Sequence, residues 1–261
     1  MDLSGLTAFV TGAGQGIGRE IAIAFAEAGA AVAITDVTDR TEETATRIDE
    51  RTDSEADTVS LRCDVTDEDA VRRAVEAAVD DLGSLDCLVN NAGIAGPTAP
   101  VESVDVGAFE ETLAVNLVGP FTVAKHAAPH LRASEQASVI NVASIGGKQP
   151  YPNRTPYAAS KAGLIGLART LAHEFADDGV TVNTINPGPV AGPRAEAVLE
   201  ARAQEAGVGY EEILARQEDD IPLGEMVEPE SIADMAVFLA SERARQVTAQ
   251  DVNVDGGMVW W

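Results

Sequence analysis

Short apolar runs alternate with longer amphipathic stretches along the whole chain. The short runs are rich in β-branched and apolar residues and predict strands. They are Thr7–Thr11, Ala31–Thr35, Thr58–Arg62, Cys87–Asn90, Ser138–Val142, Thr181–Ile185 and Asp251–Val254. The longer stretches repeat apolar residues at the helical period and predict helices. They are Glu20–Ala28, Thr41–Arg51, Asp67–Leu82, Phe109–Leu131, Pro156–Phe175 and Pro229–Ala240. This alternation predicts an α/β fold with a doubly wound, seven-stranded parallel sheet and helices on both faces.

We expect one domain over residues 1–261, because no linker, repeat or low-complexity tract interrupts the alternation. The one long insertion, Gly188–Val227, follows the sixth predicted strand and contains two short helical patterns. Ligands of open parallel sheets bind at the carboxyl ends of the strands. An insertion at that edge is therefore expected to form a substrate lid.

Acidic residues outnumber basic ones by 43 to 18, which gives a formal net charge of −25. Such a surface repels nucleic acids and anionic membranes, so we expect neither as a partner. Dense carboxylates are screened in concentrated salt, and this favours the hypothesis of a halophilic protein. The N-terminus lacks a basic segment and no apolar run could span a bilayer, so we expect a cytoplasmic location. Cys63 and Cys87 have no metal-ligand spacing and are expected to be reduced thiols.

A glycine-rich turn follows the first predicted strand. The residues TGAGQGIG, from Thr11 to Gly18, fit the pattern T-G-x-x-x-G-x-G. The pattern G-x-G-x-x-G fails, because Ile17 stands where its last glycine is required. Gly12, Gly16 and Gly18 allow the backbone to turn tightly and to approach a pyrophosphate at the start of the next helix. The turn therefore predicts a dinucleotide site.

Asp36 follows the second predicted strand, eighteen residues after Gly18. An acid near this spacing accepts hydrogen bonds from an adenosine ribose and repels a 2′-phosphate. The neighbouring positions that could offset this repulsion hold Gln15 and Val37, which are not basic. We therefore predict NAD as the cofactor in preference to NADP.

Further motifs follow the later strands. They are Asp64-Val65, Asn90-Asn91-Ala92-Gly93, Asn116, Ser144, Tyr157, Lys161 and Pro187-Gly188. Over nearly the whole chain, their order and spacing resemble those of the short-chain dehydrogenase/reductase family, which has a Rossmann fold.

The resemblance implies functional residues. It implies a catalytic tetrad of Asn116, Ser144, Tyr157 and Lys161. It implies cofactor contacts by Gly12, Gln15, Gly16, Ile17, Gly18, Asp36, Asp64, Val65, Asn91, Ala92, Gly93, Tyr157, Lys161, Pro187, Gly188 and Val190. The chain departs from the family pattern after Val190. Gly192 stands where the family usually has a threonine that helps to hold the nicotinamide amide.

The chemistry of alcohol oxidation also favours the pair Tyr157 and Lys161. When a hydride leaves the alcohol carbon, another group must take the hydroxyl proton. A free tyrosine, with a pKa of about 10, is a poor base near neutral pH. Spacing i, i+4 places Lys161 on the same helix face as Tyr157, where its charge favours the phenolate. Ser144 is expected to hydrogen-bond the reacting oxygen, and Asn116 to hold a water that connects Lys161 to solvent.

The segment Gln136–His173 contains no acidic residue, whereas the chain average would place about six there. Burial explains part of this gap, since the segment includes a predicted strand and a helix that, as the resemblance implies, packs against its twin in a dimer. It does not explain why basic residues remain. We hypothesise that Lys148, Arg154 or Arg194 binds a carboxylate of the substrate. The substrate would then be a hydroxy or keto acid, for instance a sugar acid such as a 2-keto-3-deoxy acid.

Two further patterns are expected to have structural roles. His126 and His130 have the i, i+4 spacing of a metal pair, but no third ligand is evident and Pro129 disturbs the turn, so we expect no metal. Trp260 and Trp261 end the sequence and are expected to anchor on a neighbouring subunit.

The sequence thus predicts an NAD-dependent oxidoreductase that interconverts a secondary alcohol and a ketone on a small molecule, sugar or sugar acid, as a homotetramer. One alternative is a 3-oxoacyl-(acyl-carrier-protein) reductase. Asp36 disfavours NADP, and an acidic surface would repel an acidic carrier protein. A dinucleotide-binding sensor without turnover is a second alternative. The complete set Asn116, Ser144, Tyr157 and Lys161 disfavours that interpretation.

Overall fold

The computed structural model describes residues 1–52 and 56–261, apart from the side chains of residues 194, 201 and 205. The described part contains a parallel sheet with the order β3-β2-β1-β4-β5-β6-β7. Its strands are β1 (Thr7–Thr11), β2 (Ala31–Asp36), β3 (Thr58–Arg62), β4 (Cys87–Asn90), β5 (Ser138–Val142), β6 (Thr181–Pro187) and β7 (Asp251–Val254). The predicted doubly wound α/β fold is confirmed.

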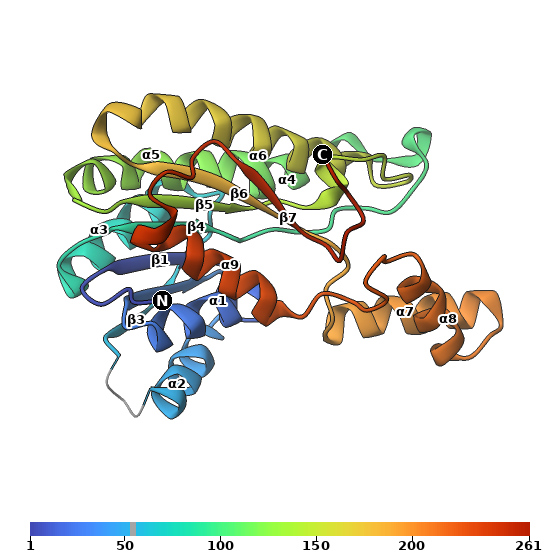
Figure 1. Ribbon diagram of the computed structural model, residues 1–261. Coiled ribbons are helices and arrows are strands. Elements are labelled where there is room, and N and C mark those ends of the chain that lie inside the picture. The colour runs from blue at the N-terminus through green and yellow to red at the C-terminus, as the bar shows by residue number, and fades with distance from the viewer. Residues whose placement is uncertain (53–55) are drawn as a thin grey trace.

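Helices cover both faces of the sheet (Figure 1). They are α1 (Gly16–Glu27), α2 (Thr41–Arg51), α3 (Glu68–Leu82), α4 (Val106–Leu113), α5 (Gly119–Ala133), α6 (Thr155–Glu174), α7 (Pro193–Ala206), α8 (Tyr210–Asp219) and α9 (Pro229–Ala240). Two apolar clusters lie between sheet and helices, one beneath α1 and α9 and one beneath α3, α5 and α6. The strands β1, β4 and β5 are buried throughout, because helices cover both of their faces.

Two helices differ from the predicted ones by more than one residue. Helix α1 begins at Gly16 and not at Glu20, because the end of the glycine-rich turn already belongs to the helix. The predicted helix Phe109–Leu131 is interrupted by a π-helical turn, η2 (Ala114–Val118), between α4 and α5. Such turns often mark functional positions, and this one contains Asn116.

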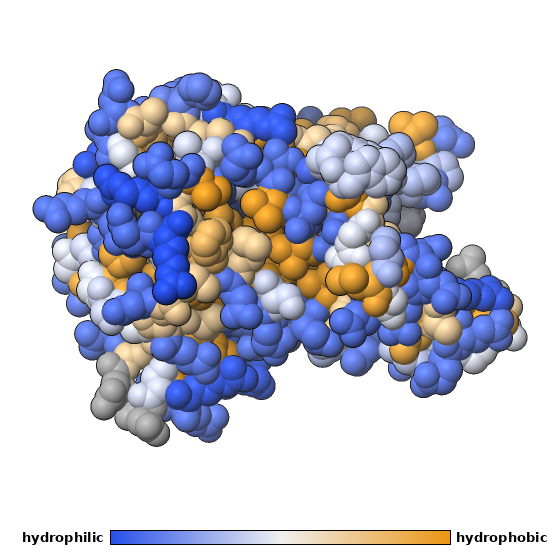
Figure 2. Space-filling model, viewed as in Figure 1, coloured by the Kyte–Doolittle hydropathy of each residue, from blue (hydrophilic) through white to orange (hydrophobic). Residues whose placement is uncertain are grey.

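The insertion Gly188–Val227 forms an arm that projects from the body of the molecule (Figures 1 and 2). Helices α7 and α8 of this arm have a small apolar cluster of their own, which includes Leu199, Ala203 and Ile213. A β-bridge between Val190 and Val227 closes its stem. The stem is stiffened by backbone hydrogen bonds, 2.9 Å from Ala191 N to Val227 O and 2.8 Å from Val227 N to Pro189 O. The arm is therefore a separately packed unit on a short stem.

Candidate active site

The strand order reverses between β1 and β4, so the loops that follow these two strands diverge there. In open parallel sheets this switch point forms a crevice at the carboxyl edge. The predicted cofactor-binding and catalytic residues lie at the ends of β1, β2, β3, β4, β5 and β6 or directly after them, or in the segment from α4 to α6 beside that edge. The topology thus gathers at one edge residues that lie far apart in the sequence.

The glycine-rich turn is packed tightly against the loop after β4. Gly12 and Gly16 have φ of +63° and +56°, a region that favours glycine. A Cβ on Gly12 would lie 2.8 Å from Ala92 Cα. Asn91 ties the two loops together, since its Nδ2 donates to Thr11 O and Gly12 O at 3.0 Å each.

The start of α1 also fits a dinucleotide phosphate. Its N-cap, Gln15, makes no side-chain capping bond, and the first turn carries no acidic residue. The first backbone N–H groups of a helix have no intrahelical acceptors, and they attract anions. The geometry of Gly12, Gly16 and the helix start therefore fits the pyrophosphate of a nicotinamide dinucleotide.

Asp36 is fixed at the end of β2 by three hydrogen bonds. Its Oδ2 accepts from Gly14 N at 3.1 Å, and its Oδ1 accepts from Thr38 N and Thr38 Oγ1 at 2.9 and 2.8 Å. Arg40, which the sequence pattern did not single out, lies beside it and hydrogen-bonds Gln15. A basic side chain four residues beyond Asp36 thus reaches the glycine-rich turn. The sequence analysis considered only Gln15 and Val37, and therefore did not reveal this contact.

Asp64 and Val65 have structural contacts in the loop after β3. Asp64 Oδ1 accepts from Thr66 N at 2.9 Å and from Thr66 Oγ1 at 2.7 Å, which closes the loop. Val65 is 7% exposed, and a Cβ on Gly119 would lie 2.8 Å from its Cγ2. The Val65 side chain therefore packs against the start of α5, and the expected contact of this pair with adenine remains a prediction.

Asn116 is held by the π-helical turn and is fully buried. Its Oδ1 accepts from Ile94 N at 2.8 Å, and its Nδ2 donates to Ile94 O at 2.9 Å. The same Nδ2 donates to Ser160 Oγ at 3.0 Å, and Ser160 Oγ donates to Tyr157 O at 2.8 Å. Ser160 was missed in the sequence, although it stands directly before Lys161. It connects Asn116 to the backbone of the predicted proton-exchanging residue.

Lys161 lies under Tyr157 on α6. Its side chain is 5% exposed, its Nζ donates to Val142 O at 2.8 Å, and the same Nζ lies 5.7 Å from the centroid of the Tyr157 ring. A Cβ on Gly93 would lie 3.6 Å from this Nζ and 3.2 Å from Asn116 Oδ1. The absence of a side chain at Gly93 thus leaves room beside both groups.

Ser144 follows β5 and caps the short 3₁₀ turn η3 (Ile145–Gly147). Its Oγ accepts from Gly146 N at 3.0 Å, which leaves the hydroxyl hydrogen available to another acceptor. A Cβ on Gly147 would lie 2.7 Å from the carbonyl carbon of Lys161. The turn that carries Ser144 therefore packs directly on α6 at the level of Lys161.

The residues after β6 frame the same edge. Gly188 N donates to Val254 O at 2.9 Å, and a Cβ on Gly188 would lie 2.8 Å from Asp255 Cα. Pro187 ends β6, and Val190 belongs to the stem of the arm. Their predicted cofactor contacts are compatible with these positions but remain predictions.

Lys148, one of the three predicted carboxylate ligands, contacts two residues of β7. Its side chain is 7% exposed, and its Nζ lies 2.8 Å from Asp251 Oδ2 and 3.0 Å from Asn253 Oδ1. Burial acts to raise the pKa of Asp251, but hydrogen bonds from Lys148 and Arg169 outweigh it and lower the pKa. Lys148 thus shares the carboxylate of Asp251 with Arg169, and it ties the loop after Ser144 to β7.

Arg154 has a different environment from Lys148. It forms no ion pair among the described residues, and its Nη2 donates to Ala95 O at 2.9 Å. The side chain of Arg194 lies outside the described part of the structure, although its backbone begins α7. Of the two predicted carboxylate ligands whose side chains are described, Arg154 is the one that lies beside Tyr157 without an acidic partner among the described residues.

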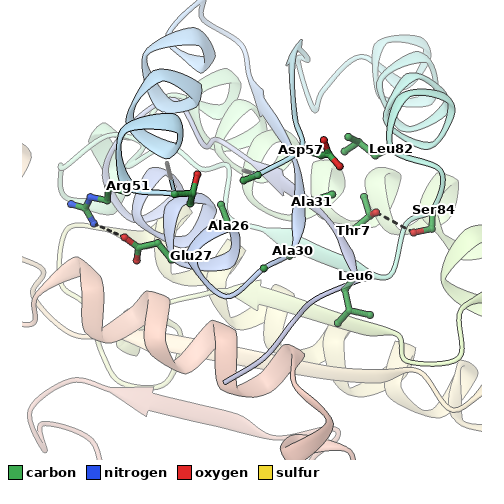
Figure 3. Close-up of a pocket in the computed structure, with 14 residues that line it drawn as sticks. Leu6, Thr7, Ala26, Glu27, Ala30, Ala31, Arg51, Asp57, Leu82 and Ser84 are labelled. Carbon is green, nitrogen blue, oxygen red and sulfur yellow. Dashed lines mark hydrogen bonds and ion pairs between the residues drawn. The ribbon is translucent and has the colours of Figure 1, made fainter. Parts of the chain in front are cut away.

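A cavity of about 490 Å³ opens at the opposite edge of the sheet (Figure 3). It is lined by the starts of β1 and β2 and by polar side chains that include Glu27, Arg51 and Ser84. Glu27 and Arg51 form an ion pair at 3.6 Å, and Ser84 Oγ donates to Thr7 Oγ1 at 3.1 Å. Because this cavity lies at the amino ends of the strands, it is separate from the candidate active site.

The remaining predicted patterns have structural surroundings of their own. His126 Nε2 lies 3.1 Å from Glu68 Oε1, and residues 1–52 and 56–261 contain no group of three potential metal ligands. Burial raises the pKa of the Cys63 thiol to about 11 and that of Cys87 to about 12.

No helix in the described part of the chain combines the length and the apolar content needed to span a bilayer. Trp260 and Trp261 are 85% and 56% exposed.

Comparisons with known proteins show which proteins this chain resembles. Residues 12–259 match a family model described as enoyl-(acyl carrier protein) reductase. The chain is 38% identical to a cis-4-hydroxycyclohexanecarboxylate dehydrogenase of Sinomonas cyclohexanicum, over 96% of this chain and 95% of that protein. It is 35% identical to the 3-oxoacyl-(acyl-carrier-protein) reductase FabG of Thermotoga maritima, over 99% and 100%. A solved structure of NAD+-bound xylitol dehydrogenase matches with a TM-score of 0.91 and 29% identity, over 98% and 100%.

Proposed function

Because the chain belongs to the short-chain dehydrogenase/reductase family, we propose that it uses NAD to interconvert a secondary alcohol and a ketone. The observation that carries this proposal is the connected set of Asn116, Ser160, Tyr157 and Lys161 beside the turn of Ser144. A buried lysine below a half-buried tyrosine, on one rigid helix, is the arrangement that proton exchange requires.

Each residue has a distinct task in the proposed reaction. Bound NAD supplies the acceptor for the hydride. Tyr157 takes the hydroxyl proton of the alcohol, and the charge of Lys161 favours the phenolate that can do so. The hydroxyl of Ser144 donates to the substrate oxygen, where negative charge develops. Asn116 holds the loop at Ile94 in place and, as proposed from the sequence, positions a water that connects Lys161 to solvent.

We further propose that the substrate carries a carboxylate, as in a cyclic hydroxy acid or a sugar acid. Arg154 supports this, because its guanidinium lies at the site without an acidic partner among the described residues. The similar dehydrogenase of Sinomonas cyclohexanicum is named for a hydroxy carboxylic acid. The arm of α7 and α8 would close over such a substrate as a lid, with Arg194 at its first turn.

The proposal is tested by a panel of secondary alcohols assayed with NAD and with NADP in molar KCl. Each hydroxy acid is paired with the neutral alcohol of the same skeleton. We expect turnover with NAD and a kcat/KM at least about tenfold higher for the acid, the difference that one charge-assisted hydrogen bond provides. Equal kcat/KM within each pair would contradict the carboxylate, and no turnover on any alcohol would contradict the function.

Use of NADP is the second possibility that a specific observation favours. Arg40 lies beside Gln15 and next to Asp36, where a basic group could offset the repulsion between Asp36 and a 2′-phosphate.

The carbonyl-reducing relative from Thermotoga maritima keeps the 3-oxoacyl-carrier alternative open, and the net charge of −25 argues against an acidic carrier. The same panel separates these possibilities when a 3-oxoacyl thioester and NADPH are included.

We also propose a homotetramer, because two different apolar surfaces are exposed. On α4, the π-helical turn and α5, Val106, Val118 and Phe121 are about half exposed or more. On the edge strand β7 and helix α9, the partly exposed apolar residues are Met235, Phe238, Val252 and Val254. Figure 2 shows apolar side chains gathered over this second surface. Two distinct self-complementary surfaces build a closed tetramer, and the exposed pair Trp260 and Trp261 would add to an interface.

Sedimentation in molar KCl should give four times the chain mass of 27.2 kDa. Dialysis into buffer without KCl should lower the melting temperature, because repulsion among 43 acidic residues is then no longer screened. A monomer in molar KCl would refute the tetramer. A melting temperature that is unchanged or higher without KCl would refute the adaptation to salt.

A further inference from the structure

Arg154 is in contact with the rings of two tyrosines at the start of α6. Its Cζ lies 5.1 Å from the centroid of the Tyr157 ring and 5.4 Å from that of the Tyr151 ring. The two rings lie edge to face, with centroids 6.2 Å apart. A guanidinium within about 6 Å of an aromatic centroid is attracted by the electrons of the ring. Arg154 therefore interacts directly with the residue assigned to proton exchange.

The guanidinium is fixed in this position. Nη2 donates to Ala95 O at 2.9 Å, which attaches Arg154 to the loop after β4. Its Nε is buried and has no hydrogen-bond partner among the described residues. Burying such a donor costs free energy unless another interaction compensates for it. The two tyrosine rings are the groups in contact that provide this compensation.

Lys161 is a second described cation near the same ring. Its Nζ lies 5.7 Å from the centroid of the Tyr157 ring. Several elements pack against this part of α6, and some of them carry charged residues or are paired with one. These charged residues are Lys148, Asp251, Asp105, Glu110 and Glu111. The first two form an ion pair with each other, and the three acids of α4 and its N-cap are exposed. The strands β5 and β6 carry no charged residue.

We propose that Arg154 is a positioning residue for proton exchange, a second cation that orients the Tyr157 ring and favours its phenolate together with Lys161. The proposal rests on Tyr157 being the proton-exchanging group of the proposed function. When Tyr157 loses its proton, negative charge spreads over the ring, and a cation at its face is attracted more strongly than before. Removal of that cation should leave the phenolate less favoured. Tyr157 should then lose its proton at a higher pH.

The test is a spectroscopic titration of Tyr157 without substrate. The chain has three tyrosines, so the tyrosinate absorbance of the parent minus that of Tyr157→Phe isolates Tyr157. For each variant, the absorbance of the double variant that also carries Tyr157→Phe is subtracted in the same way. For Arg154→Leu we expect the midpoint to rise by about 0.5 to 1.5 pH units, the range that a cation–π contact supplies. Arg154→Lys keeps a cation and should show less than half of this rise.

Arg132→Leu is the matched control. Arg132 Cζ lies 5.2 Å from the centroid of Phe175, so this variant removes a similar contact far along α6 from the site. It should leave the Tyr157 midpoint unchanged. An equal midpoint in Arg154→Leu and Arg132→Leu would overturn the proposal. If Arg154→Leu fails to fold, Arg154→Gln removes the charge with less change in polarity. Its Tyr157 midpoint is then compared with that of Arg132→Leu.

The titration is independent of the proposed substrate. A raised midpoint together with no turnover on any alcohol would support the role of Arg154 and contradict the proposed function. Turnover together with an unchanged midpoint would support the proposed function and contradict the role of Arg154. With a neutral alcohol as substrate, the acid limb of the kcat profile should move upward by the same amount in Arg154→Leu, because Tyr157 must be deprotonated to accept the proton.

Discussion

Replacement of Tyr157 by phenylalanine is expected to lower kcat by about 10²- to 10⁴-fold, the usual contribution of general acid–base catalysis. The variant keeps the ring and therefore its contacts with Arg154 and Tyr151. It loses only the hydroxyl oxygen, which exchanges the proton in the proposed reaction. The fold and the affinity for NAD should change little, since the dinucleotide fit lies in the glycine-rich turn and the start of α1.

Steady-state kinetics in molar KCl measures the loss, and fluorescence titration with NADH measures the cofactor affinity. The matched control is Tyr151→Phe, which removes a hydroxyl from the neighbouring ring. Its kcat should remain close to that of the parent. A Tyr157→Phe variant with parental kcat and an intact melting transition would show that another group exchanges the proton.

Strand boundaries were well predicted because buried parallel strands are short apolar runs between polar turns. β1, β3, β4, β5 and β7 have the predicted limits. β2 continues to Asp36 and β6 to Pro187, one and two residues further than expected. Polar or proline residues at a strand end weaken the apolar signal, although backbone pairing with a neighbouring strand continues there.

Other features could not be predicted from the sequence, because they depend on contacts that form only in the folded chain. The π-helical turn around Asn116 keeps the apolar pattern of a continuous helix, so periodicity did not distinguish it from α-helix. The partner of Lys148 is Asp251, more than 100 residues away in the sequence. Arg40 reaches Gln15 only because the loops after β1 and β2 lie side by side. Patterns that are local in sequence thus indicated the elements and motifs, but not which charges are paired across them.

The second large effect is expected at Gly18, in the first turn of α1. A Cβ there would lie 2.3 Å from Asn91 Nδ2 and 2.3 Å from Gly12 O, distances that require the turn to move. Asn91 Nδ2 is also the donor that holds Thr11 O and Gly12 O. Gly18→Ala should therefore destabilise the fold by roughly 1–3 kcal/mol through overpacking. Its affinity for NAD should fall by at least about tenfold, because the turn that is proposed to bind the pyrophosphate is displaced.

Gly166→Ala is the control that separates packing from helix propensity. Gly166 is a helical glycine like Gly18, but it lies in the interior of α6, and a Cβ there would meet no atom within 4 Å. Alanine is favoured over glycine in helices by up to about 1 kcal/mol, so this variant should be neutral or more stable than the parent. Denaturant unfolding and NADH titration on both variants give the comparison. Since helix propensity alone would stabilise both proteins, equal stability of the two variants would mean that the loop after β4 does not press on the glycine-rich turn as the structure indicates.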